Sequence, residues 1–223
     1  MACLHGTRIE ILAEIDVWSH ATDSQNLLWL KGVAGSGKIA ITHSVAQKLQ
    51  EDGRLASSFF FSRGIAELSK PQLIFTTMAR DIASRNAAIA EDISNTLDNE
   101  PALAFAHLSR QFEALIAGPL RRNGTQAPFI VVIDALDEGI CGDADTHFLD
   151  ILCNEVPKLA SHLLILVTSR PTNLITQSFS GSEHIKSLQI DIHSAVILHY
   201  MSMRNCGKAL CEIEWVQTGP TRW

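Results

Sequence analysis

The stretch GVAGSGK, from Gly32 to Lys38, decides the fold of this chain. It supplies all but the last position of the phosphate-binding loop pattern G-x-x-x-x-G-K-[ST]. Glycines in such a loop adopt backbone angles and close approaches that a Cβ would forbid, so successive amide N–H groups can point at phosphate oxygens. The apolar run Leu27–Leu30 before the loop and the helical spacing of apolar residues after it predict a strand–loop–helix unit.

We expect phosphate to bind to the loop amides, to the N-terminus of the following helix and to the compact charge of the lysine. The predicted binding residues are Gly32, Ala34, Gly35, Ser36, Gly37, Lys38 and Ile39.

Ile39 departs from the pattern, because a Ser or Thr hydroxyl at this position normally ligates Mg²⁺ and isoleucine has no oxygen to offer. Thr42 one helical turn later, Ser36 within the loop, or a water molecule could replace that hydroxyl. We therefore expect phosphate binding to persist, while Mg²⁺ affinity and hydrolysis are weakened.

Composition restricts the class of protein. The 223 residues are 46% hydrophobic, which is enough to bury the core of one large α/β domain. A net charge of -6 and a pI near 5.8 argue against a nucleic-acid-binding face, which needs a basic stripe. Five cysteines without a CxxC pair indicate neither a disulfide framework nor a zinc site. Without a signal peptide or an apolar run of ~18 residues, we expect a cytoplasmic protein that binds neither nucleic acid nor membrane.

Short apolar segments predict a parallel sheet of about five strands flanked by helices, an α/β fold. The interval from Ser62 to Pro128 shows no strand pattern and is far longer than a simple crossover needs, so it should hold several helices. The last of these helices is expected to end near Gly118-Pro119. The predicted strands are Leu27–Leu30, Leu55–Phe61, Phe129–Ile133, Leu163–Thr168 and, more weakly, Leu188–Ile190.

Acidic side chains follow the clearest of these strands. Phe129–Ile133 runs directly into Asp134-Ala135-Leu136-Asp137-Glu138. Ligands of open α/β sheets gather at the carboxyl ends of the strands, so these carboxylates should face the phosphate-binding loop. We predict that Asp134 holds Mg²⁺, directly or through water, and that Asp137 and Glu138 orient or deprotonate an attacking water. An acidic turn alone is usually a solvated loop, and only the upstream loop favours the functional interpretation.

A basic residue follows the next predicted strand. Arg170 lies in the sequence Thr168-Ser169-Arg170-Pro171, where its guanidinium could reach the γ-phosphate of a nucleotide and report its presence. An exposed arginine at the end of a strand is an equally good interpretation of the pattern.

Together these segments resemble the NACHT family of signal-transducing ATPases, and most closely the fungal group of NLR-like proteins. The resemblance covers roughly residues 3 to 200, and its most specific part is the combination of VIDALDE with TSRP. It implies an AAA-like strand order, binding of ATP or GTP, and a nucleotide-dependent switch between a closed monomer and an open, self-associated form. The segments that carry it are CLHGTR, LLWLKGVAGSGK, LASSFFFSR, FEALIAGPL, FIVVIDALDE and LILVTSRP.

The resemblance also assigns roles to individual residues. Lys38 matches the Walker A lysine and Asp134 the Walker B aspartate. Asp137 and Glu138 match the extra acidic pair of this family, and Arg170 matches its sensor arginine. It further implies that Arg8, in the GTR segment, lies near the base or the ribose.

The domain organisation departs from that family. We predict an N-terminal linker helix in residues 1–22, a NACHT-like nucleotide-binding domain in residues 23–202, and an atypical tail in residues 203–223. The winged-helix and repeat domains that normally follow a NACHT region are not encoded in this sequence, and we expect a truncated or misread gene product.

The leading hypothesis is a nucleotide-binding signalling switch with weak NTPase activity. A non-hydrolysing interaction scaffold or a truncated fragment is the alternative. A small-molecule P-loop kinase is less favoured, because the helical interval holds arginines but no recognisable lid segment.

Overall fold

The computed structural model describes residues 8–21, 25–65, 71–140, 142 and 146–190. Its five strands form one sheet in the order β2-β3-β4-β1-β5, and every neighbouring pair is parallel. This arrangement confirms the predicted α/β fold with an AAA-like strand order. The strands are β1 (Leu27–Lys31), β2 (Leu55–Phe60), β3 (Phe129–Asp134), β4 (Leu163–Ser169) and β5 (Ile185–Gln189).

The central strands are apolar throughout because helices cover both faces of the sheet. Along β1, Leu28 and Leu30 pack into one hydrophobic cluster, while Leu27 and Trp29 pack into the other. A continuous run of buried residues, rather than an alternating pattern, is the expected result of this two-sided burial.

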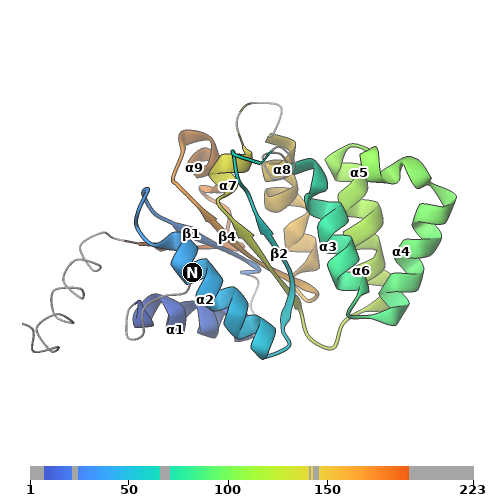
Figure 1. The fold of residues 1–223 in the computed structure, drawn as a ribbon, viewed down its shortest axis with the longest axis horizontal. Coiled ribbons are helices and arrows are strands. Elements are labelled where there is room, and N and C mark those ends of the chain that lie inside the picture. The colour runs from blue at the N-terminus through green and yellow to red at the C-terminus, as the bar shows by residue number, and fades with distance from the viewer. Residues whose placement is uncertain (1–7, 22–24, 66–70, 141, 143–145, 191–223) are drawn as a thin grey trace, which may run out of the picture. The chain divides into compact units, whose positions relative to one another are not determined.

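Two helices cover one face of the sheet (Figure 1), namely α1 (Ile9–His20) and α2 (Lys38–Glu51). The remaining helices pack into the cluster on the opposite face or extend beyond it. They are α3 (Ile74–Ala83), α4 (Ala87–Asn99), α5 (Leu108–Phe112), α6 (Gly118–Asn123), α7 (Leu136–Gly139), α8 (Thr146–Asn154) and α9 (Asn173–Phe179), with short 3₁₀ turns at Pro71–Leu73, Pro101–Phe105 and Val156–Leu159.

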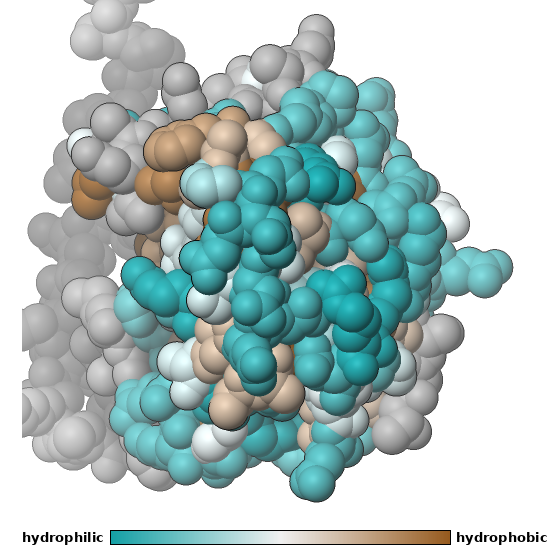
Figure 2. Space-filling view, turned by 90° about the vertical axis from the view of Figure 1, so that its right-hand side faces the viewer, coloured by the Kyte–Doolittle hydropathy of each residue, from teal (hydrophilic) through white to brown (hydrophobic). Residues whose placement is uncertain are grey.

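The predicted helical interval between β2 and β3 forms a lobe of α3 to α6 at one side of the sheet (Figure 1). Its outward face carries mainly hydrophilic side chains (Figure 2). The lobe explains why the long interval lacks a strand pattern: α3 packs on β2 while α4 and α6 pack on each other.

One predicted helix end is wrong. The helix that begins at Leu108 does not stop at Gly118-Pro119 but continues through a π-helical turn, Glu113–Ala117, into α6. The Gly118 N–H donates to the Glu113 carbonyl across this wider turn. Pro119 then occupies the start of α6, where its missing N–H costs little. A Cβ on Gly118 would lie 3.0 Å from the Glu113 carbonyl oxygen, so glycine suits this close approach.

Two further findings concern the extent of the chain. In the part of the chain that the structure describes, no helix combines the length and apolar character needed to span a membrane. The predicted domain boundary at residue 202 and the tail at 203–223 lie outside the described residues and stay predictions.

Candidate functional site

The loop Gly32–Lys38 joins the end of β1 to the start of α2. Gly35 and Gly37 have φ angles of 75° and 92°, in the left-handed region that favours glycine. Gly32 meets a different constraint, because a Cβ there would lie 2.5 Å from the Ser36 Oγ. Backbone conformation therefore explains the glycines at positions 35 and 37, and the close approach of the Ser36 side chain explains the glycine at position 32.

Lys38 is folded back over this loop. Its Nζ donates hydrogen bonds to the carbonyl oxygens of Gly32 at 2.6 Å and Val33 at 3.0 Å. The ammonium group is thus held at the mouth of the loop by neutral acceptors, which an anion could replace.

The charged groups predicted for the site lie within electrostatic range of one another. Burial lowers the pKa of Lys38, while the negative charges of Asp137 and Asp134 raise it and the positive charge of Arg170 lowers it. The predicted lysine, both buried aspartates and the sensor arginine are therefore brought together at one end of the sheet.

Asp134, the last residue of β3, joins the loop helix to the sheet. It is only 4% exposed, and its Oδ1 accepts hydrogen bonds from Thr42 Oγ1 at 2.8 Å and Thr168 Oγ1 at 2.5 Å. Because Thr42 lies one turn after Lys38 on α2, the loop and the acidic strand end meet at the same edge, as the sequence predicts. The Oδ2 of Asp134 accepts no hydrogen bond from the described residues and is the oxygen left for a cation.

Of the two hydroxyls that could replace the one missing at position 39, that of Thr42 donates to a carboxylate and that of Ser36 is buried within the loop. Ile39 is 57% exposed and belongs to neither hydrophobic cluster. The hydroxyl hydrogen of Thr42 is shared between the Lys38 carbonyl at 2.9 Å and Asp134, so this group serves the carboxylate. Ser36 Oγ is buried against Gly32 and has no hydrogen-bond partner among the residues that the structure describes. The donor set fits a Mg²⁺ ion held by one carboxylate oxygen, with phosphate and water supplying the rest.

The acidic turn that follows β3 is short. Ala135 has φ 55° in the left-handed region and immediately precedes α7. Asp137 is 4% exposed, and its two carboxylate oxygens accept from the backbone N–H of Arg170 at 2.8 Å and from its Nε at 2.6 Å. The Glu138 carboxylate accepts from the backbone N–H of Arg63 at 3.2 Å. The two members of the predicted acidic pair therefore have different surroundings.

A match to a known protein family shows which family the chain belongs to. Residues 6–170 match the family described as nephrocystin 3, N-terminal. The chain belongs to the nephrocystin 3 N-terminal family. Its fold is that of a P-loop NTPase-like module related to the NACHT region, which confirms the coarser part of the sequence resemblance. No curated protein matches the chain.

Three solved structures match this nephrocystin 3 N-terminal chain at low sequence identity. The structure of C. elegans PCH-2 has 13% identity and a TM-score of 0.42, covering 89% of this chain and 47% of that one. Drosophila ORC bound to DNA has 12% identity and a TM-score of 0.47, covering 82% and 29%. The Pif1 helicase from Candida albicans has 12% identity and a TM-score of 0.40, covering 92% and 44%. The chain spans less than half of the length of each of these three proteins.

Two residues that hold the acidic turn in place, Thr168 and Arg63, were not predicted from the sequence of this nephrocystin 3 N-terminal chain. Thr168 is one of two polar residues at the end of the fully buried strand β4, and this polarity was the available signal. Besides donating to Asp134, its Oγ1 accepts from the Ala135 N–H at 3.1 Å. Arg63 follows β2 and donates from Nη2 to the Asp137 carbonyl at 3.0 Å. Both residues fix the acidic turn rather than face the loop.

Arg8 contacts the loop from outside. Its Nη2 donates to the Ser36 carbonyl at 2.8 Å, which ties the start of α1 to the Gly32–Lys38 loop. The predicted position of Arg8 beside a base or ribose stays a prediction.

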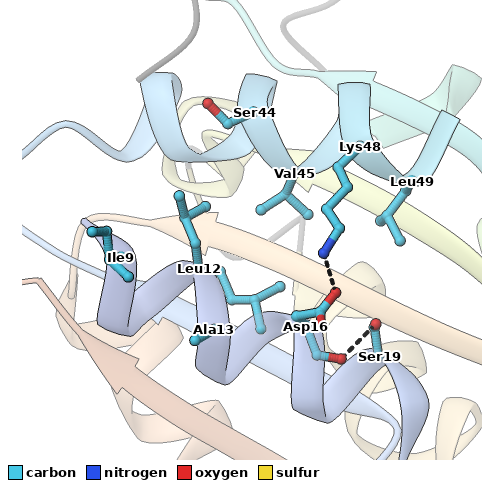
Figure 3. A pocket seen from close by; sticks show the side chains of 10 residues that line it. Ile9, Leu12, Ala13, Asp16, Ser19, Ser44, Val45, Lys48 and Leu49 are labelled. Carbon is cyan, nitrogen blue, oxygen red and sulfur yellow. Dashed lines mark hydrogen bonds and ion pairs between the residues drawn. The ribbon is translucent and has the colours of Figure 1, made fainter. Parts of the chain in front are cut away.

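A groove of about 450 Å³ between α1 and α2 is separate from this site (Figure 3). Its walls are mainly apolar, and an ion pair between Lys48 Nζ and Asp16 Oδ1, 2.5 Å long, crosses it. No residue of the Gly32–Lys38 loop lines the groove. The candidate nucleotide site is therefore the open edge of the sheet rather than this groove.

Proposed function

We propose that this chain is a nucleotide-binding switch module that binds ATP or GTP and hydrolyses it weakly. The observation that carries the proposal is the hydrogen bond between Thr42, on the loop helix, and Asp134, at the end of β3. This contact brings a loop of phosphate-binding sequence and a buried carboxylate to the same edge of a parallel sheet. That edge is where nucleotide phosphates bind in folds of this type.

The residues would divide the work as follows. Amide groups of Gly35, Gly37 and Lys38, with the Lys38 ammonium, would bind the phosphates. Asp134 would hold Mg²⁺ through one oxygen or through water, and the ion would neutralise charge on the phosphates. Glu138 is proposed to orient or deprotonate the attacking water. Because Ile39 supplies no ligand, we propose weak Mg²⁺ affinity and slow hydrolysis.

A direct test is equilibrium binding of a fluorescent ATP analogue, mant-ATP, to the full chain, with unlabelled ATP and GTP as competitors. We expect saturable binding in EDTA and only a modest gain on adding Mg²⁺. No binding under either condition would favour the interaction scaffold. Phosphate transfer from ATP to an added metabolite would favour the kinase.

Restoring the missing ligand should increase turnover. We expect Ile39→Ser to raise the hydrolysis rate at least about tenfold, since a metal ligand worth ~1.4 kcal/mol of transition-state stabilisation gives that factor. Phosphate release at saturating ATP and Mg²⁺ measures the effect. Ile39→Val is the matched control, because it shortens the side chain without adding oxygen. Equal rates for the two variants, both binding mant-ATP, would refute the metal argument.

Membership of the fungal NLR-like group and self-association through this module are proposed on the sequence resemblance alone. Sedimentation of the full chain with and without ATP tests the second point. We expect a shift towards a larger species with ATP.

A further inference from the structure

We propose that Asp137 is a positioning residue that anchors the guanidinium of Arg170, so that its terminal nitrogens face the outermost phosphate of a nucleotide on the Gly32–Lys38 loop. This inference rests on the proposed function. It assigns Asp137 a role different from the activation of water that the sequence pattern predicts.

The carboxylate of Asp137 is fully engaged by a single residue. Its Oδ1 accepts the backbone N–H of Arg170 at 2.8 Å, and its Oδ2 accepts the Nε–H at 2.6 Å. The side chain of Asp137 is only 3% exposed, so few water molecules can reach it. A buried carboxylate that binds a guanidinium through one oxygen and a backbone N–H through the other is a poor base, because taking a proton would disrupt these contacts.

The anchor is itself fixed in place. Arg63 Nη2 donates to the backbone carbonyl of Asp137 at 3.0 Å, which ties the acidic turn to the end of β2. The ring of Phe61 lies directly against Gly139 at the other end of α7, so close that a Cβ there would be 2.2 Å from it. A carboxylate on a turn with these two contacts holds the attached guanidinium in one direction.

The guanidinium of Arg170 is bound through its Nε, and the side chain is partly exposed. Its Nε is bound by Asp137, while its two terminal nitrogens make no hydrogen bond to the described residues, and the side chain is 42% exposed. The residue before it, Ser169, accepts the N–H of Gly32 at 3.2 Å, which places Arg170 next to the first residue of the loop. Planar paired donors of this kind suit phosphate oxygens.

The arrangement favours a nucleotide with a third phosphate. The loop and Lys38 would contact the inner phosphates of ATP and ADP alike, whereas Arg170 would reach only the outermost group. Turning the guanidinium away from Asp137 would leave a buried carboxylate without its counter-ion, so the anchored direction is strongly preferred. Asp137 would thereby make the module prefer ATP over ADP without touching either nucleotide.

The test compares the dissociation constants of mant-ATP and mant-ADP for the full chain in EDTA, so that no metal contributes. We expect the wild-type chain to prefer mant-ATP, and Arg170→Ala and Asp137→Asn each to reduce that preference about five- to tenfold, with little change for mant-ADP. The double variant should match Arg170→Ala alone, because both changes remove one interaction. Asp92→Asn is the matched control: it disrupts a similar pair, with Arg122 at 2.9 Å, on the helical lobe and should leave the preference unchanged.

A second variant covers the case in which Asp137→Asn does not fold. Arg170→Lys keeps the positive charge but has no Nε to anchor, and we expect it to lose the ATP preference as Arg170→Ala does. Retention of the preference in Arg170→Lys, or additive effects of the two single changes, would overturn the inference. So would an Asp137→Asn variant that stops hydrolysis but keeps the wild-type binding ratio, since that outcome indicates a base. Equal wild-type affinity for both nucleotides overturns this inference alone, whereas binding of neither overturns the proposed function.

Discussion

Lys38→Ala is expected to weaken binding of mant-ATP to the full chain by about 100-fold, equivalent to ~2.7 kcal/mol. Lys38 carries the positive charge of the loop, and its Nζ lies over the Gly32 and Val33 carbonyl oxygens at 2.6 and 3.0 Å. Phosphate binding would exchange these neutral acceptors for an anionic one, which forms a stronger, charge-assisted hydrogen bond. Alanine removes that charge, and fluorescence titration in EDTA measures the loss directly.

Lys48→Ala is the matched control for this experiment. Lys48 lies on the same helix, but its ammonium pairs with Asp16 across the groove between α1 and α2, away from the loop. Its side chain is 58% exposed, so we expect little change in stability and no change in nucleotide affinity. Equal affinities of the wild-type chain and Lys38→Ala would show that phosphate does not bind at this loop.

The sheet and the edge that holds the candidate site could be predicted because the sequence signals for them are local. The loop GVAGSGK and the apolar runs on either side depend on neighbours along the chain, and burial on both faces of a parallel sheet produces such uninterrupted runs. The carboxyl ends of parallel strands necessarily lie at one edge. The location of Asp134 at the same edge as the Gly32–Lys38 loop therefore followed from the strand assignment alone.

The partners of the site residues could not be predicted in the same way. Thr42, Asp134 and Thr168 come together only because β4 lies between β1 and β3, and the sequence does not state that order outside a family resemblance. Thr42 was considered as a replacement metal ligand, whereas in the structure it donates to the carboxylate. Whether a hydroxyl serves a metal or a carboxylate depends on distances that residue spacing does not contain.

The pairing of Asp137 with Arg170 illustrates the same limit of sequence patterns. An acidic pair after a strand looks like two equivalent catalytic groups, but only Asp137 is turned inward against the end of β4. The π-helical turn at Glu113–Ala117 is a comparable case. The Gly118-Pro119 pattern is usual for a helix end and does not indicate that the helix continues through a wider turn.

Gly139→Ala is expected to destabilise the chain by about 2–3 kcal/mol, because it overfills a packed contact. A Cβ at this position would lie 2.2, 2.3 and 2.7 Å from three carbons of the Phe61 ring. Phe61 is 4% exposed and packs edge-on against Phe59 at 5.0 Å between ring centroids, so the ring has little room to move. Urea denaturation of the variant and the wild-type chain measures the difference.

Two further variants decide whether this contact is the cause. Gly142→Ala adds the same methyl group where no atom of the described residues lies within 4 Å, and it should change stability by less than ~0.5 kcal/mol. Adding Phe61→Leu to Gly139→Ala should recover part of the lost stability, because a smaller side chain makes room for the Cβ. Equal stability of Gly139→Ala and Gly142→Ala would contradict the packing argument. Since Asp137 lies in the same four-residue helix as Gly139, a displaced α7 should also lower the preference of the folded variant for ATP over ADP.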